Sequence, residues 1–75
     1  MDSAEEFKAR LAEGNKLAPS LVGLNRDVAV DRVKGRGFEA QAIPATADAI
    51  SADLAANRIR LLLDEDDTVV RAWAG

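Results

Sequence analysis

The segment RIRLLLD, residues 58–64, constrains the fold of this chain most strongly. Side chains of a strand point alternately to its two faces, so a strand that alternates apolar and charged residues has one buried face. We expect the buried face to carry Ile59, Leu61 and Leu63. The same alternation places Arg58 and Arg60 together on the opposite face, where two neighbouring cations need either solvent or a partner.

A hairpin is predicted at the C-terminal end of the chain. The acidic run at 64–67 predicts a turn, and the run TVVRAWA at 68–74 predicts a strand that pairs antiparallel with the one before it. The acidic run is not expected to bind calcium, because it lacks the alternating ligands and the central glycine of a calcium-binding loop. We therefore interpret it as a solvated turn.

Neither a disulfide nor a Cys/His metal site stabilises this fold, because the 75 residues include no cysteine and no histidine. A chain of this length forms one small domain, which buries only about 60% of the surface of its unfolded form. Packing alone must hold it together, and we expect no cofactor and no metal. An enzyme is also not expected, since there is no histidine for acid–base catalysis, no cysteine nucleophile and no glycine-rich phosphate loop.

The charge and hydropathy patterns argue against two classes of partner. A net charge of −3 with scattered cations lacks the clustered basic surface that a nucleic-acid backbone needs, so no nucleic acid is expected. No apolar run approaches the roughly 20 residues that span a bilayer, and residues 1–6 lack the features of a signal peptide, so no membrane association is expected. The compartment stays open: the sequence as written fits a cytoplasmic protein and equally fits the mature form of a secreted one.

Two helices are predicted in the first half of the chain. Phe7 and Leu11 form an i, i+4 apolar pair in a short N-terminal helix that is expected to end at Gly14. Asn25 is expected to cap a second helix, which runs from residue 26 to about residue 34 and is the main helix of the fold.

The segment at 45–57 has two alternative structures. It follows a strand predicted at 38–43, and six of the twelve residues at 45–56 are alanine, with Ile50 and Leu54 four residues apart. This composition favours a crossover helix between parallel strands. No apolar stripe runs along the segment, however, and an unpacked helix of this length is unstable. The alternative is a long exposed loop, a kind of connection that is usually functional in a compact domain.

The loop interpretation gives the two strand arginines a role. In an extended backbone, Ser51 and Asp53 project to one side and Ala52 projects to the other. Ser51 and Asp53 have the same spacing as Arg58 and Arg60 on the strand that follows. The arginines would then hold the loop from below while Ala52 points outward.

Several stretches of the chain are similar to the potato inhibitor I family of serine-protease inhibitors. They are PSLVG at 19–23, AIP at 42–44, SADLAANRIRLLLD at 51–64 and VVRAWAG at 69–75. The resemblance implies an α+β fold: one main helix packed on a small mixed sheet, with the first two strands parallel and joined by an exposed reactive-site loop, and the last pair antiparallel. We expect residues 1–15 to form an N-terminal helical extension and residues 16–75 to form the inhibitor-like domain.

The resemblance further implies a reversible, substrate-like inhibitor whose loop enters a protease active site. Matched back from the first strand arginine, the reactive-site bond joins Ala52 and Asp53. The flank of the loop comprises Ile50, Ser51 and Leu54, and its supports comprise Arg58, Arg60 and Gly75. Counted forward from Pro44, the loop is one residue longer than in the family, and the bond would then join Ser51 and Ala52.

Alanine at the specificity position suits a protease pocket that accepts small side chains. The predicted partner is therefore a subtilisin-like or elastase-like serine protease, and a trypsin-like one is not expected because no basic residue lies at the bond. We expect a monomer. The alternative function is a non-inhibitory interaction module on the same fold, which would bind its partner through the N-terminal helix and its Phe7–Leu11 pair.

Overall fold

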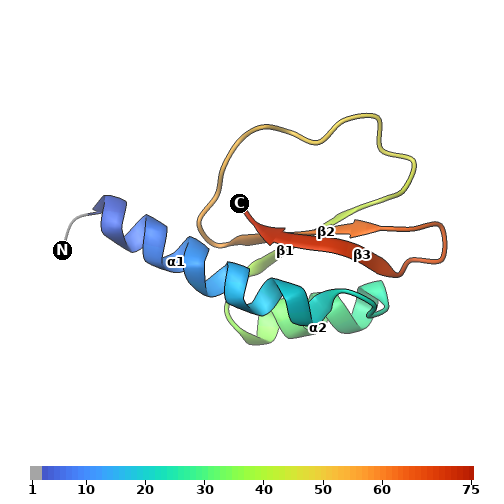
Figure 1. Ribbon diagram of the computed structural model, residues 1–75, viewed down its shortest axis with the longest axis horizontal. Coiled ribbons are helices and arrows are strands. Elements are labelled where there is room, and N and C mark those ends of the chain that lie inside the picture. Colours follow the sequence, from blue (N-terminus) through green and yellow to red (C-terminus); the bar gives the residue numbers. More distant parts are fainter. Residues whose placement is uncertain (1–2) are drawn as a thin grey trace.

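The computed structural model describes residues 3–75 and shows two helices on one face of a small sheet and a long loop over the other face (Figure 1). In chain order the elements are α1 (Ser3–Leu17), the short 3-10 helix η1 (Ala18–Leu21), α2 (Arg26–Gly35), β1 (Glu39–Ile43), β2 (Arg58–Leu63) and β3 (Val69–Ala74). The predicted α+β fold is confirmed. Residues 1 and 2 of the predicted N-terminal extension lie outside the described residues.

β2 is the central strand of a mixed sheet with the order β1-β2-β3. β1 runs parallel to β2, with Gln41 opposite Arg60, and β3 runs antiparallel to β2, with Ala72 opposite Leu61. Parallel strands cannot be joined by a tight turn, because the chain must return along the sheet before the second strand begins. This topology requires the long connection between β1 and β2.

The connection between β1 and β2 is a loop. It contains only turns, at 45–46 and 56–57, and none of the helix that its alanine content favours. The crossover-helix interpretation is therefore wrong, and the loop interpretation is confirmed. Local propensity is overridden because the segment has no apolar stripe to pack against the sheet, and because side chains of β2 bind its backbone in an extended form.

The hydrophobic core lies between the sheet and the helices. Its buried side chains are Leu21, Ala29, Val33, Phe38, Ile59, Leu61, Leu63 and Val69. The predicted core face of β2 is thus confirmed. Burying one leucine or isoleucine side chain contributes about 1.5–3 kcal/mol, so the three from β2 anchor the sheet to the helices.

α2 begins where predicted. Asn25 caps it, because the Oδ1 atom of Asn25 accepts a hydrogen bond of 2.9 Å from the backbone N of Asp27. The helix ends at Gly35, and Gly37, with a φ of 81°, turns the chain toward β1. None of the helices in residues 3–75 is long and apolar enough to cross a membrane.

α1 is longer than predicted, because it continues through Gly14 to Leu17. A glycine near the end of a helical pattern often marks a C-cap, but Gly14 serves close packing instead. A Cβ atom built on Gly14 would lie 2.7 Å from the Cβ of Ala74 in β3 and 3.3 Å from the ring of Phe38. The Oδ1 of Asn15 also accepts a hydrogen bond of 3.0 Å from the backbone N of Ala74. The C-terminal half of α1 therefore packs against the end of β3.

The acidic run between β2 and β3 forms a turn around Asp64. Its Oδ1 atom accepts hydrogen bonds of 2.9 Å from the backbone N of Asp66 and of Thr68. Asp67 has a φ of 59°, in the left-handed region that aspartate adopts more readily than most residues. Within residues 3–75, no three His, Cys, Asp or Glu side chains converge on a point where they could hold a metal ion.

Candidate functional site

Residues 50–54 form the crest of the loop, and all five are exposed. The crest carries two large apolar side chains, with Ile50 43% exposed and Leu54 61% exposed. Ser51, Ala52 and Asp53 lie between them. A run of exposed backbone flanked by apolar side chains offers a partner both main-chain groups and hydrophobic contacts.

Arg60 lies beneath the crest and is almost fully buried, with 3% of its side chain exposed. Its Nη1 donates a hydrogen bond to the carbonyl oxygen of Ser51, and its Nη2 donates one of 2.6 Å to the carbonyl oxygen of Asp53. The same Nη2 lies 3.3 Å from Oδ1 of Asp53. One guanidinium therefore holds the two carbonyls on either side of Ala52, a task that suits the rigid fork of arginine.

Arg58 supports the crest from the neighbouring position of β2. Its Nη1 donates a hydrogen bond of 3.1 Å to Oδ2 of Asp53, and its Nη2 donates one of 3.1 Å to the carbonyl oxygen of the same residue. Its Nε donates one of 2.6 Å to the main-chain oxygen of Gly75. Gly75 in turn donates its backbone N–H to the carbonyl oxygen of Arg58, at 2.9 Å. Arg58 thus connects the crest to the end of β3.

Asp53 collects most of these interactions. The hydroxyl of Ser51 donates a hydrogen bond to its Oδ1 and so spans the residue between them. The pKa of Asp53 lies below its ordinary value, first because Ser51 donates to the carboxylate and second because Arg58 does. Burial opposes these two effects and raises the pKa, and the charges of Arg58 and Arg60 each lower it by less than burial raises it. The carboxylate is therefore ionised at neutral pH and ready to accept these hydrogen bonds.

Ala52 stands apart from this network. In the described part of the chain it makes no hydrogen bond, while both of its neighbours are held from below. Its methyl group is exposed. The crest therefore presents the carbonyl and N–H of Ala52 between two residues whose carbonyl oxygens are held by Arg60.

The two arms of the loop are supported differently. The arm after the crest returns to the sheet through two backbone hydrogen bonds, from Arg58 N to Ala55 O at 3.3 Å and from Glu39 N to Asn57 O at 2.6 Å. The arm before the crest borders an open hollow of about 300 Å³, which is lined by Gln41, Ala42, Ile43, Pro44, Ala47, Ala49, Ile50 and Ser51. The arm before the crest also has a local backbone hydrogen bond, from Ala47 N to Pro44 O at 3.0 Å, so the added support of the arm after the crest is its bond to Glu39 in β1.

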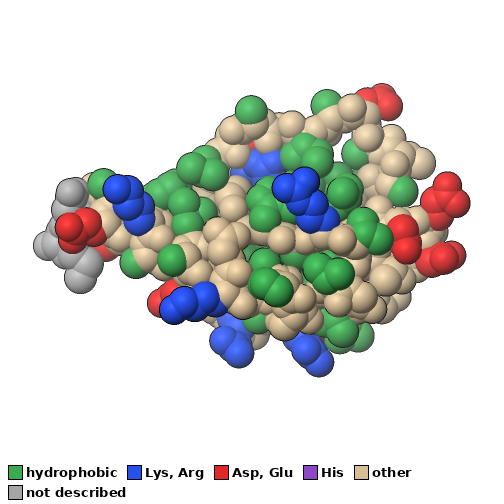
Figure 2. All heavy atoms as spheres, viewed as in Figure 1, with side chains coloured by type: hydrophobic (Ala, Val, Ile, Leu, Met, Phe, Trp, Pro, Cys, Tyr) green, Lys and Arg blue, Asp and Glu red, His purple; other side chains and the backbone are tan. Residues whose placement is uncertain are grey.

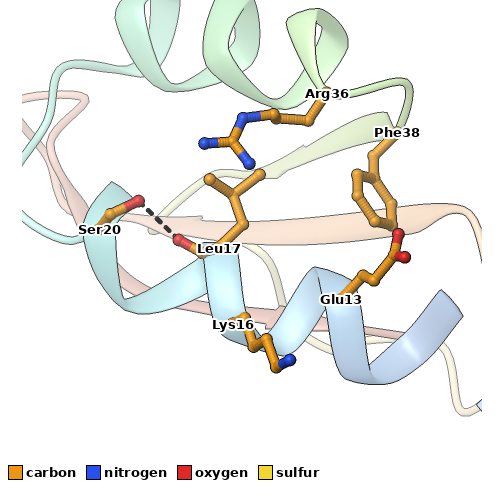
Figure 3. A pocket seen from close by; sticks show the side chains of 6 residues that line it. All are labelled: Glu13, Lys16, Leu17, Ser20, Arg36 and Phe38. Carbon is orange, nitrogen blue, oxygen red and sulfur yellow. Dashed lines mark hydrogen bonds between the residues drawn. The ribbon is translucent and has the colours of Figure 1, made fainter. Parts of the chain in front are cut away.

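A second hollow, of about 540 Å³, lies between α1 and α2, away from the loop (Figure 3). It is lined by Glu13, Lys16, Leu17, Ser20, Arg36 and Phe38. Basic side chains lie in the last turns of both helices, and Figure 2 shows several blue groups along the lower edge of the molecule. Cations there offset the negative ends of the two helix dipoles. The hydroxyl of Ser20 already donates to the carbonyl oxygen of Leu17, at 2.6 Å.

The other predicted site residues lie apart from the crest. Phe7 and Leu11 are half-buried on α1. Sequence reasoning missed two residues at the base of the loop, Arg10 and Asn57, whose side chains form a hydrogen bond of 2.7 Å. They are separated by 47 positions and belong to no recognisable motif, so no local signal connects them.

No protein-family model matches the chain, and no curated protein matches its sequence. Among solved structures, the fold is similar to that of the elastase inhibitor AFUEI, with a TM-score of 0.60. The similarity covers 89% of this chain and 97% of that one, at 16% sequence identity. At this identity the likeness is one of fold. The chain therefore shares its architecture with an elastase inhibitor.

Proposed function

We propose that this chain is a reversible, substrate-like inhibitor of serine endopeptidases and a member of the potato inhibitor I family. The observation that carries the proposal is the pair of hydrogen bonds from Arg60 to the carbonyls of Ser51 and Asp53, on both sides of an unbonded Ala52. The similarity in fold to an elastase inhibitor supports it. In this proposal the crest is the reactive site, and Arg58, Arg60 and Gly75 are its supports.

Affinity would come from the order of the crest before binding. A flexible peptide loses conformational entropy when it enters a protease cleft, whereas a loop that is already extended loses much less. The side chain of Arg58 is 15% exposed, and its two hydrogen bonds to Asp53 lie at the surface. The side chain of Arg60 is only 3% exposed, so its hydrogen bonds to the crest are largely shielded from water. Shielding of this kind strengthens a charge-assisted hydrogen bond.

Persistence of the complex would come from the same contacts. The protease serine attacks the carbonyl carbon of Ala52, the peptide bond to Asp53 breaks, and the nitrogen of Asp53 takes up a proton and becomes a free amine. Arg60 still holds Ser51 and Asp53, and the hydroxyl of Ser51 still binds the Asp53 carboxylate. The amine stays beside the acyl-enzyme and re-forms the peptide bond more often than water reaches it.

The geometry favours Ala52–Asp53 over Ser51–Ala52 as the reactive-site bond. A protease must place the carbonyl oxygen of the cleaved bond in its oxyanion hole. The oxygen of Ser51 is occupied by Arg60 beneath the crest, whereas that of Ala52 has no such partner within residues 3–75. With Ala52 at the specificity position, the proposed targets are elastase-like and subtilisin-like enzymes, whose pockets take small or apolar side chains.

The test is a titration of the purified protein against subtilisin and against pancreatic elastase, with residual hydrolysis of a chromogenic peptide as the readout. We expect stoichiometric inhibition of at least one enzyme. Ala52→Asp should abolish it, because a carboxylate at the specificity position is not accepted by a small apolar pocket. Ala12→Asp is the matched control: it makes the same change at an exposed position of α1 and should inhibit like the parent.

Two results would contradict the proposal. In the first, both proteases remain fully active at an excess of the protein. In the second, the loop is cut rapidly and both enzymes recover in parallel with the cut. Inhibition that survives Ala52→Asp would instead move the reactive site away from Ala52.

A further inference from the structure

All three nitrogens of the Arg10 guanidinium, on α1, make hydrogen bonds, and one of these bonds reaches the base of the loop. Its Nε donates a hydrogen bond of 2.7 Å to Oδ1 of Asn57, and its Nη2 donates one of 2.8 Å to the carbonyl oxygen of Gly37. Its Nη1 contacts Oε2 of Glu13 at 3.0 Å, on the outer side. The guanidinium carbon also lies 3.8 Å from the centre of the Phe38 ring, within the range of a cation–π contact.

The residues held by α1 are the neighbours of the Arg58 anchor. Asn57 directly precedes Arg58, and its carbonyl oxygen accepts the backbone N–H of Glu39 in β1. On the other side, Asn15 of α1 accepts the backbone N–H of Ala74, which precedes the Gly75 oxygen bound by Arg58. α1 therefore holds the residue that precedes Arg58 and the residue that precedes Gly75, to which Arg58 bonds.

We propose that α1 is part of the inhibitory device and that Arg10 is a positioning residue for the reactive-site loop. Arg10 bonds to Asn57, which directly precedes β2. This bond keeps the first residue of β2, Arg58, in position to bind Asp53. This inference rests on the proposed function, because its consequence concerns the bond between Ala52 and Asp53. It gives the N-terminal helix a role in how long the inhibitor resists cleavage.

Loss of this grip has a specific consequence. The fragment that leaves the acyl-enzyme begins at Asp53 and is tied to the scaffold through Arg58 and Arg60. If the hydrogen bonds at Asn57 break, Arg58 is no longer held in position to bind Asp53. The amine of Asp53 then stays beside the acyl group for less of the time. Water then competes better, so the loop is hydrolysed faster even where the first encounter with the protease is unchanged.

The experiment compares four substitutions in the full chain. Arg10→Ala and Asn57→Ala each remove one partner of the 2.7 Å hydrogen bond. Asn57→Asp keeps an Oδ acceptor for Arg10 and serves as the conservative replacement. Val33→Ala is the control for stability, because Val33 is fully buried in the core and takes no part in the hydrogen bonds of the Arg10 and Asn57 side chains.

The first readout is amide hydrogen exchange and needs no protease. The backbone N–H of Glu39 and of Arg58 close the base of the loop, so their exchange reports its opening. In Arg10→Ala and in Asn57→Ala we expect these two amides to exchange about 10-fold faster relative to global unfolding of the same variant, the effect of losing one charge-assisted hydrogen bond. In Asn57→Asp and Val33→Ala the exchange rate of these amides relative to global unfolding should stay at the parental value.

The second readout is the rate at which stoichiometric subtilisin or elastase cuts the loop. We expect about 10-fold faster cutting in Arg10→Ala and in Asn57→Ala, but not in Val33→Ala at a temperature where that variant is folded. If the parent inhibits and Arg10→Ala resists cutting equally well, the positioning role is overturned. If the parent fails to inhibit but the two amides respond to Arg10→Ala, the proposed function fails while the grip of α1 on the loop base stands. Unchanged exchange at both amides overturns the inference in either case.

Discussion

Arg60 is a buried cation whose guanidinium donates hydrogen bonds to backbone carbonyls. Hydrogen bonds to a charged group contribute about 1.5–3 kcal/mol each when shielded, and Arg60 directs such bonds to Ser51 and Asp53. Its Nε atom has no hydrogen-bond partner among the residues described, which costs about 1–3 kcal/mol. The hydrogen bonds that Nη1 and Nη2 donate offset this cost. A lysine ammonium has no fork with which to reach two carbonyls at once.

Asp53 makes the support of the loop dependent on pH. Its pKa is lowered in the folded loop, chiefly by the hydroxyl of Ser51 and then by Arg58, so the folded loop prefers the ionised carboxylate. Support is therefore complete above the ordinary pKa of aspartate, about 3.9, and is lost as the pH falls through the lowered value. We expect no change in loop order between about pH 5 and pH 8 and a loosening below about pH 4.

The carboxyl carbon of Asp53 provides the measurement, since its NMR chemical shift follows ionisation directly. A titration midpoint below that of free aspartate should coincide with increased backbone mobility at Ser51 and Asp53. Asp53→Asn should leave that mobility independent of pH over the same range. A midpoint at or above the ordinary value would contradict the arrangement around this carboxylate.

At the scale of elements, the contact between α1 and β3 depends on the missing side chain of Gly14. Alanine favours a helix over glycine by about 1 kcal/mol, yet at this position its Cβ would lie 2.7 Å from that of Ala74. Overpacking of this kind destabilises by about 1–3 kcal/mol, so we expect Gly14→Ala to lower the free energy of unfolding. Gly35→Ala in α2 is the matched control, because no atom lies within 4 Å of its Cβ position. Denaturant unfolding of both variants measures the difference.

The control should be neutral or stabilising by about 0.4–1 kcal/mol, as expected when alanine replaces glycine without strain. If Gly14→Ala is also neutral or stabilising, helix propensity dominates at Gly14 and the close approach of α1 to β3 is not rigid. If only Gly14→Ala is destabilised, the helix is held firmly against the sheet. The hydrogen bond from Arg10 can position Asn57 only if α1 itself is held in place in this way.

The elements that sequence predicts well are those whose signals are local. The alternation along β2 gave its buried face, and Asn25 gave the start of α2, because burial and capping act on neighbouring positions. Composition could not choose between helix and loop at 45–57, because the deciding hydrogen bonds come from Arg60 on another element. The prediction that the first helix ends at Gly14 was wrong for the same reason, since its close neighbour Ala74 lies 60 positions away in sequence. The spacing of Ser51 and Asp53 predicted that the two strand arginines hold the crest, but only the structure shows which backbone oxygens they bind.

At the scale of the whole molecule, the two faces of the sheet have separate tasks. The helices and the core cover one face, and the loop covers the other (Figure 1). The crest is exposed throughout and contributes little to the core. The core itself is shared between two parts of the chain: Leu21, Ala29, Val33 and Phe38 precede the crest, and Ile59, Leu61, Leu63 and Val69 follow it.

This division predicts that a chain cut at the crest stays folded. Ala52→Met allows cleavage by cyanogen bromide after residue 52, which gives the pieces 2–52 and 53–75. Neither piece can bury its apolar face alone, because β2 packs on the helices and pairs with β1, which belong to the other piece. We expect the pieces to reassociate after removal of the reagent and to elute together with the uncut protein in size-exclusion chromatography.

Thermal unfolding distinguishes a shared core from chance association. Unfolding of the cut protein releases two molecules, so its midpoint temperature should rise with protein concentration, whereas the midpoint of the uncut variant should not. The parental chain treated with the same reagent loses only Met1 and controls for chemical damage. Pieces that stay apart and unfolded would show that the covalent loop, rather than the shared core, holds the two halves together. In that case a cut reactive-site bond could not be re-formed, and reversible inhibition would be ruled out along with it.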